Sequence, residues 1–176
     1  MNTKELLEFN KNRKITQIGI VTDDYKRTIQ YLTEKFNWGP WDILIDSQKT
    51  SSNVYFKGEA VDEWEFYYVL TMVGDMQIEL LQPISGPNPY DEFLEKYGPG
   101  IHHFKEAFTE DELKAKTKWF ENNGNYNIYG GEDGDDLYSY FDCFNECGFY
   151  YEIGNGAIGD ADLSSLPNYV GRYPEK

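Results

Sequence analysis

Histidine and cysteine are scarce in this chain, with two of each, and this limits the metal sites that it can build. Cys143 and Cys147 lack the further cysteines or the spaced histidine pair of a zinc finger, so we expect free thiols. His102 and His103 are adjacent, and neighbouring side chains of a strand face opposite sides. We therefore expect only one of them in a common site, which excludes the two-histidine, one-carboxylate arrangement of non-haem iron(II) oxygenases within one chain.

Basic residues are also few: 16 Lys and Arg stand against 31 Asp and Glu, for a net charge of −15. Such a surface repels phosphates and anionic lipids, so we expect neither nucleic acid nor a membrane as a partner. It also disfavours long-range attraction of anionic cofactors such as coenzyme A. No run approaches the roughly 18 apolar residues of a membrane helix, and the first residues lack the apolar core of a signal peptide. We expect a cytoplasmic protein.

What the chain does contain is an internal repeat. A strand-like segment at 15–22 runs into a Thr- and acid-rich helix start, and the same pattern returns at 101–109. A second similarity links 77–81 with 150–153. Such a repeat indicates two similar units that bury their faces against each other. Each unit is predicted as one strand, one helix and three strands, which gives an α+β fold with mainly antiparallel strands and helices on the outer faces.

The predicted organisation has five parts. They are an N-terminal helical extension (1–13), a first βαβββ module (14–84), a connector with a short helix (85–99), a second βαβββ module (100–155) and a C-terminal tail (156–176). Asn88 and Pro89 predict the start of the connector helix, and Thr109 with Glu112 predicts a capping box in the second module. The polar stretch 47–62 is expected to be a loop or irregular strand, and the tail to wrap the surface.

Strand alternation identifies a candidate site. In the first strand, Gln17 faces away from the branched residues that should pack under the helices. Glu79 and Glu152 likewise alternate with apolar neighbours, and His103 is the repeat equivalent of Gln17. Each of these residues alone is more often structural, but together they obey the repeat. One imidazole, two carboxylates and an amide oxygen suit one divalent ion such as zinc, nickel, cobalt or manganese.

Four motifs resemble those of the vicinal oxygen chelate (glyoxalase / bleomycin resistance / dioxygenase) superfamily: TQIGIV at 16–21, GDMQIELLQP at 74–83, GPGIHHF at 98–104 and YFD…GFYYEI near the end. Within that superfamily, the middle motifs are closest to those of methylmalonyl-CoA epimerase and glyoxalase-like proteins. The resemblance spans residues 14–155 and implies paired modules curled around a metal-centred cleft. The family's ligand positions fall on Gln17, Glu79, His103 and Glu152. Gln17 stands where the epimerases usually have histidine, and their additional glutamate base has no clear match.

The resemblance implies a metal-dependent isomerase, epimerase or lyase of the glyoxalase type. The metal would polarise a carbonyl of a small acid, thioester or ketone, and Glu152 or Glu79 would move the α-proton through an enolate. Lys105 shares a face with the histidine ligand and is a candidate for substrate binding, as are Tyr140 and Tyr150. The alternative is a non-enzymatic protein that binds a drug or metabolite in the same cleft. We expect a small-molecule substrate and a homodimer, with the cleft formed either within one chain or between two.

Overall fold

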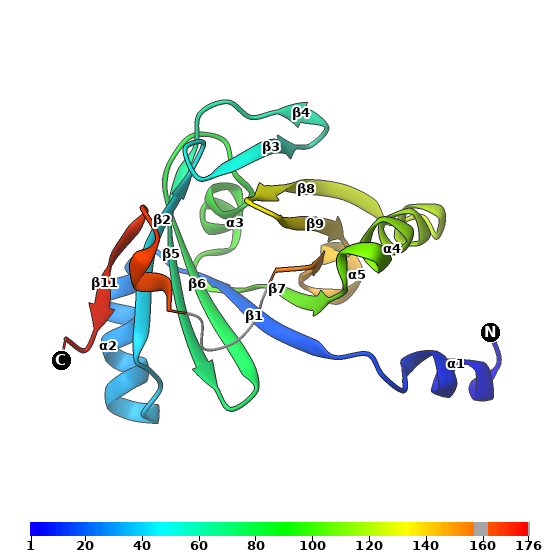
Figure 1. Ribbon diagram of the computed structural model, residues 1–176, viewed down its shortest axis with the longest axis horizontal. Coiled ribbons are helices and arrows are strands. Elements are labelled where there is room, and N and C mark those ends of the chain that lie inside the picture. Colours follow the sequence, from blue (N-terminus) through cyan, green and yellow to red (C-terminus); the bar gives the residue numbers. More distant parts are fainter. Residues whose placement is uncertain (157–161, 176) are drawn as a thin grey trace.

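The computed structural model describes residues 1–156 and 162–175, whose strands form one sheet. The strands are β1 (Ile15–Val21), β2 (Trp41–Ser47), β3 (Ser51–Phe56), β4 (Glu59–Ala60), β5 (Glu65–Val73), β6 (Met76–Ser85), β7 (Gly100–Ala107), β8 (Tyr126–Asp133), β9 (Asp136–Asp142), β10 (Tyr150–Gly154) and β11 (Tyr169–Tyr173). Their order across the sheet is β11-β2-β5-β6-β1-β7-β10-β9-β8-β3-β4. The sheet curls into a half-barrel (Figure 1).

The helices begin where the sequence offers capping side chains. They are α1 (Thr3–Asn10), α2 (Tyr25–Phe36), α3 (Pro89–Tyr97), α4 (Glu110–Asn122) and α5 (Phe144–Cys147), with a 3₁₀ turn at Leu163–Ser165. Asn88 accepts hydrogen bonds from the first amides of α3, and Thr109 and Glu112 form the predicted capping box of α4. None of the helices in the described residues has both the length and the apolar character needed to span a bilayer.

The two repeats are joined through their first strands. β1 and β7 pair antiparallel at the centre of the sheet, and each pairs in parallel with the last strand of its own repeat, β6 or β10. The other strand pairs are antiparallel. The predicted α+β fold, with tandem βαβββ modules in a curled and mainly antiparallel sheet, is confirmed.

Apolar side chains divide into an outer layer and an inner layer. α2 packs Tyr25 and Ile29 against the outer face of the first half, and α4 packs Leu113 and Phe120 against that of the second. α3 lies between the halves and adds Tyr90 and Phe93 to the inner cluster (Figure 1). The outer helices leave the concave face of the central strands available for polar residues.

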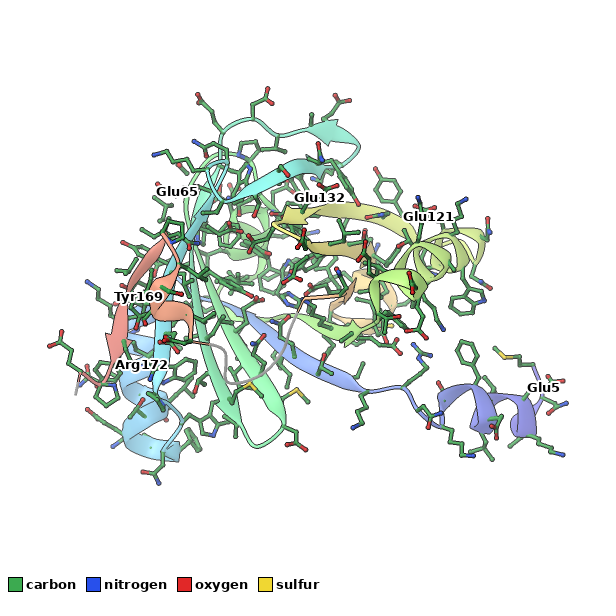
Figure 2. The ribbon with its side chains drawn as sticks, in the orientation of Figure 1. Glu5, Glu65, Glu121, Glu132, Tyr169 and Arg172 are labelled. Carbon is green, nitrogen blue, oxygen red and sulfur yellow. The ribbon has the colours of Figure 1, made fainter. Side chains whose placement is uncertain are left out.

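Two strands near the ends of the sheet differ from the expectation of irregular chain. In the polar stretch 47–62, β3 crosses to the other half of the sheet and pairs with β8. In the tail, β11 pairs with β2, and Arg172 binds Asp42 through two hydrogen bonds of 2.8 and 2.7 Å. Tyr169 and Arg172 mark this edge in Figure 2. Residues 157–161 and 176 of the predicted tail lie outside the described residues.

Candidate functional site

A row of three residues crosses the centre of the sheet. Gly19 on β1 pairs with Glu79 on β6 and with His103 on β7. The imidazole of His103 lies over Gly19, because a Cβ placed on this glycine would overlap the ring atoms. The absent side chain lets His103 extend across β1, and its Nε2 lies 3.0 Å from Oε2 of Glu79.

A second row runs beside the first. Gln17 pairs with Gln77 on one side and with Lys105 on the other, and Lys105 pairs with Glu152 on β10. The amide nitrogen of Gln17 donates to Oε1 of Gln77 over 2.5 Å and to Oε1 of Glu79 over 3.3 Å. Lys105 binds Oε1 of Glu152 over 3.0 Å. These contacts hold one oxygen of each glutamate and leave the other pointing inward.

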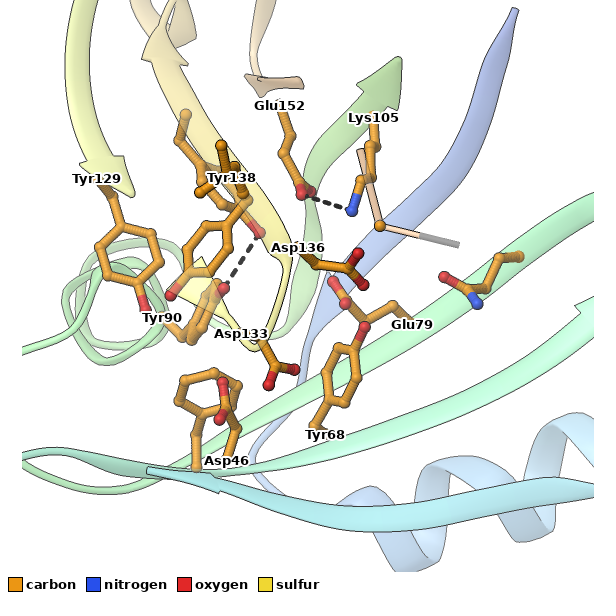
Figure 3. Close-up of a pocket in the computed structure, with 15 residues that line it drawn as sticks. Asp46, Tyr68, Glu79, Tyr90, Lys105, Tyr129, Asp133, Asp136, Tyr138 and Glu152 are labelled. Atoms are coloured by element: carbon orange, nitrogen blue, oxygen red, sulfur yellow. Dashed lines mark hydrogen bonds and ion pairs between the residues drawn. The ribbon is translucent and has the colours of Figure 1, made fainter. Parts of the chain in front are cut away.

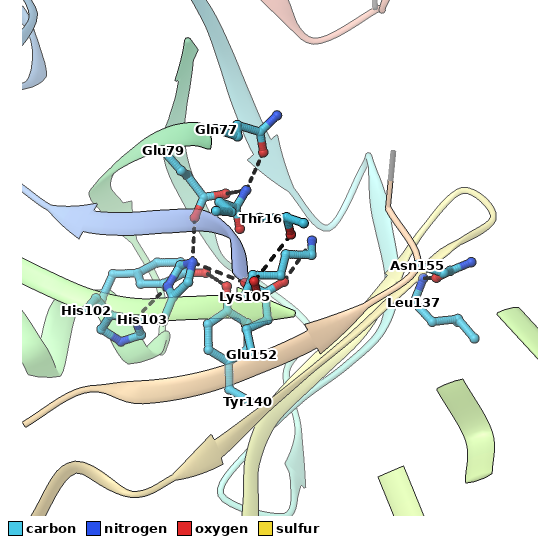
Figure 4. Close-up of polar contacts among 12 residues, drawn as sticks. Thr16, Gln77, Glu79, His102, His103, Lys105, Leu137, Tyr140, Glu152 and Asn155 are labelled. Atoms are coloured by element: carbon cyan, nitrogen blue, oxygen red, sulfur yellow. Dashed lines mark hydrogen bonds and ion pairs between the residues drawn. The ribbon is translucent and has the colours of Figure 1, made fainter. Parts of the chain in front are cut away.

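The inward oxygens meet the same imidazole nitrogen. Oε2 of Glu152 lies 3.1 Å from Nε2 of His103, which also contacts Oε2 of Glu79 (Figure 4). The predicted ligands Gln17, Glu79, His103 and Glu152 are each at most 3 % exposed. The structure thus brings residues from both repeats together in one buried cluster.

Each of the four predicted ligands carries a buried polar atom without a hydrogen-bond partner in the described residues. These atoms are Oε1 of Gln17, Oε2 of Glu79, Nε2 of His103 and Oε2 of Glu152. The contacts to Nε2 are close but lack hydrogen-bond geometry. Buried polar atoms are normally satisfied, so such a set needs a further partner.

The donor chemistry fits a divalent ion. Nitrogen and carboxylate oxygen bind zinc and similar ions at about 2.0–2.2 Å, so neighbouring ligands in an octahedral site lie about 3 Å apart. The contacts of 3.0 and 3.1 Å match that spacing. Among the described residues, however, no group of three or more His, Cys, Asp and Glu side chains is arranged so that it could hold a metal ion as it stands.

His102 lies on the same side as His103, so the expectation that they face opposite sides is wrong. Gly19 pairs with His103 and Ile20 with Ile101, which leaves His102 as the extra residue of a β-bulge. Its Nδ1 lies 3.0 Å from Nδ1 of His103. Burial and the neighbouring His103 keep the pKa of His102 well below its usual value, so the ring is neutral. His102 therefore contacts the side of the imidazole opposite the carboxylates.

A pocket of about 90 Å³ opens beside this cluster (Figure 3). Its lining includes Lys105, five carboxylates and five tyrosines: Asp46, Glu79, Asp133, Asp136 and Glu152, with Tyr68, Tyr90, Tyr129, Tyr138 and Tyr140. Burial alone would lower the pKa of Lys105, but the negative charges of Glu152, Glu79 and Asp136 outweigh it and raise that pKa. Lys105 is therefore a charged residue within a predominantly acidic pocket.

The predicted substrate-binding residues do not all reach the pocket. Lys105 and Tyr140 line it, and the Tyr140 ring meets the His103 ring edge-on with centroids 4.9 Å apart. Tyr150 does not line the pocket. Its ring packs against His102 and Phe144, on the side of His103 opposite the carboxylates.

Several lining residues have no counterpart in the sequence prediction. Gln77 could have been found, because it lies two positions before Glu79 and shares its face. Asp46, Asp133 and Asp136 carry no such signal. They belong to different repeats and meet only because β3 crosses to β8.

Comparisons with known proteins agree with this architecture. Residues 16–138 match the family described as Glyoxalase/Bleomycin resistance protein/Dioxygenase superfamily. A hypothetical protein from Bacillus halodurans is 18 % identical with a TM-score of 0.62, covering 86 % of this chain and 99 % of its own. The methylmalonyl-CoA epimerase of Mycobacterium tuberculosis is 16 % identical with a TM-score of 0.58, covering 82 % and 88 %.

A third structure holds a ligand. A variant of the Streptomyces coelicolor methylmalonyl-CoA epimerase in complex with 2-nitronate-propionyl-CoA is 15 % identical with a TM-score of 0.59, covering 82 % of this chain and 98 % of its own. At such identities the likeness concerns the fold. No protein of curated function matches the sequence.

Proposed function

Because the chain belongs to the glyoxalase/bleomycin resistance protein/dioxygenase superfamily, we propose that it is a metal-dependent isomerase, epimerase or lyase of the glyoxalase type. It moves an α-proton of a small acid, thioester or ketone. The observation that carries the proposal is the set of four unpartnered donor atoms on Gln17, Glu79, His103 and Glu152. They come from both repeats: the atoms of Glu79, His103 and Glu152 meet at one buried point beside a pocket, and Gln17 contacts Glu79 through its amide nitrogen.

These four residues would hold one divalent ion, of zinc, nickel, cobalt or manganese. When bound, such an ion polarises the substrate carbonyl and stabilises the negative charge that develops as the α-proton leaves. His102 orients the imidazole by contacting its Nδ1, as the outer partners of metal-binding histidines commonly do.

The two glutamates are the candidate bases. Lys105 holds Oε1 of Glu152 and Gln17 holds Oε1 of Glu79, so either glutamate would act as base after its Oε2 is released from the ion. Two carboxylates allow a proton to be removed by one and returned by the other on a different face or carbon. Tyr140, buried beside His103, would shield the imidazole from water.

The alternative is a protein that binds a drug or metabolite in the same cleft without turnover, which the tyrosine-rich lining of the pocket favours. The proposal also includes a homodimer in the cytoplasm, as expected from the sequence. Sedimentation equilibrium measures the oligomeric state.

Solvent deuterium exchange at the α-carbon distinguishes enzyme from binder. The protein, incubated in D₂O with methylmalonyl-CoA or hydroxyacetone, should catalyse deuterium uptake that NMR detects. Glu152→Gln should reduce the rate at least about 100-fold, because general base catalysis contributes this much. Glu95→Gln, an exposed change of the same kind on α3, should leave it unchanged. Full exchange by Glu152→Gln would refute the assigned base, and no exchange by the unaltered protein would favour the binder.

A further inference from the structure

The outer part of the pocket has an excess of negative charge that the proposed chemistry does not use. Asp46, Asp133 and Asp136 line it in addition to the two glutamates. Lys105 is the single basic side chain in the described lining, and it is already paired with Glu152 over 3.0 Å. With a divalent ion between the glutamates, the five carboxylates would still face only three positive charges, including that of Lys105, which leaves a net charge of −2.

The three aspartates lie close together because β3 pairs with β8 of the other repeat. Asp46 lies near the end of β2, whereas Asp133 and Asp136 flank the turn between β8 and β9. Ser51, the first residue of β3, pairs with Asp133 and donates a hydrogen bond of 3.0 Å to Asp46. β3, which joins the two halves, therefore also links Asp46 to Asp133 through Ser51. Figure 3 shows the three aspartates around the pocket.

In the described residues, Lys105 is the one cation that acts on these aspartates through its charge, and it makes no ion pair with any of them. Asp46 accepts only from neutral donors, the amide of Ser47 and the hydroxyls of Thr50 and Ser51. The side chains of Asp133 and Asp136 make no hydrogen bond or ion pair within the described part of the chain. The charge of Asp136 raises the pKa of Asp133, so these carboxylates repel each other, and an external cation would reduce the repulsion.

A second observation points to a ligand in the same place. The hydroxyls of Tyr129 and Tyr138 are buried without a hydrogen-bond partner in the described residues, and both side chains line the pocket. Tyr129 is only 1 % exposed. Aromatic rings also attract cations through their faces, and Tyr68 and Tyr90 line the same pocket.

We propose that the aspartate side of the pocket binds an ammonium group, so that the substrate is a small amine-bearing carbonyl compound and not a coenzyme A thioester. This narrows the substrate class of the proposed function and rests on it. A pocket of about 90 Å³ suits a compact substrate, and its charge repels the phosphates of coenzyme A.

Three ketones of similar size test the charge preference. Aminoacetone carries an ammonium group, hydroxyacetone is neutral, and pyruvate carries a carboxylate. Calorimetric titration at pH 7 should show aminoacetone binding at least about tenfold more tightly than hydroxyacetone, as one favourable ion pair provides. Pyruvate should bind most weakly.

Two double variants test whether the preference for aminoacetone over hydroxyacetone depends on the aspartates of the pocket. Asp133→Asn with Asp136→Asn should reduce it to within about twofold, because both side chains face the pocket without structural partners. Asp62→Asn with Asp75→Asn, an equal change of charge at exposed positions away from the pocket, should keep it. Equal binding of aminoacetone and hydroxyacetone, or an undiminished preference in the first pair, would overturn the proposal.

Deuterium uptake in the same samples separates this inference from the proposed function. A preference for aminoacetone without exchange would support the ammonium site and contradict the enzyme. Deuterium uptake by both ketones, together with equal affinity for them, would support the enzyme and contradict the ammonium site.

Discussion

The imidazole of His103 occupies the space above Gly19, where the side chain of any other residue would begin. The two residues face each other across the central strand pair that joins the repeats. The contact of His103 with Glu79 therefore depends on the other repeat having glycine at position 19.

Replacing Gly19 by alanine tests this dependence. The new methyl group would displace the His103 ring, so we expect metal affinity to fall at least about tenfold, as seen when the support of a metal ligand is lost. Competition with a fluorescent zinc chelator measures the affinity. Gly171→Ala is the matched control, since nothing lies near that position. Unchanged affinity in Gly19→Ala would contradict the role given to this contact.

His102→Phe tests whether the contact of His102 with Nδ1 of His103 positions the His103 ring. Phenylalanine preserves the ring that packs among Tyr90 and Phe93 but removes the nitrogen that contacts Nδ1 of His103. We expect metal affinity to fall about 10- to 100-fold, as for other outer partners of metal ligands. His102→Asn, which restores a polar partner, should recover part of it. A lower melting temperature with unchanged affinity would mean that His102 is only structural.

Asp46→Asn should stabilise the protein at neutral pH. Burial raises the pKa of Asp46 from 3.8 to about 6, with a smaller contribution from the charge of Asp133. The folded state then binds more protons than the unfolded state between these values, so this group lowers stability as pH rises through the window. The variant should gain up to roughly 3 kcal/mol at pH 7, and less toward pH 4.

Urea denaturation across pH 4–7 measures this gain, with Asp75→Asn as the exposed control. A gain that is as large at pH 4 as at pH 7 would show that charge burial is not its cause. A stabilising change at a pocket residue is consistent with a charge kept for binding.

Arg13→Ala should be strongly destabilising. Arg13 binds the buried Glu106 through two hydrogen bonds of 2.6 and 2.5 Å, and Glu106 is 1 % exposed. Removing the guanidinium leaves a buried charge whose remaining side-chain hydrogen bond, within the described residues, comes from the hydroxyl of Tyr151, at a cost of about 3–5 kcal/mol. Arg27→Ala breaks an exposed pair with Asp23 and should cost less than about 1 kcal/mol in the same denaturation experiment. Similar losses in both variants would contradict this comparison.

The repeat and strand alternation were sufficient to place much of the candidate site. Gln17, Glu79 and Glu152 lie on the concave face because their apolar neighbours pack under α2 and α4. The same periodicity predicted the helices and the mainly antiparallel sheet. These features depend on local sequence, which is why they could be read from it.

The rest depends on contacts between distant segments. Alternation placed His102 on the wrong side, because the bulge opposite Gly19 and Ile20 depends on strand pairing. The polar residues before and within β3 gave no sign that this strand would pair with β8 and bring Asp46 to Asp133. Residues that meet through such a crossing share no local pattern.

Elemental analysis tests the central claim most directly. The untagged protein, purified without chelators and incubated with zinc, nickel, cobalt or manganese, should hold about one divalent ion per chain. His103→Ala should lose the ion while its circular dichroism spectrum is retained. Absence of a bound ion from the unaltered protein under all four conditions, or full retention in His103→Ala, would contradict a metal centre built on His103.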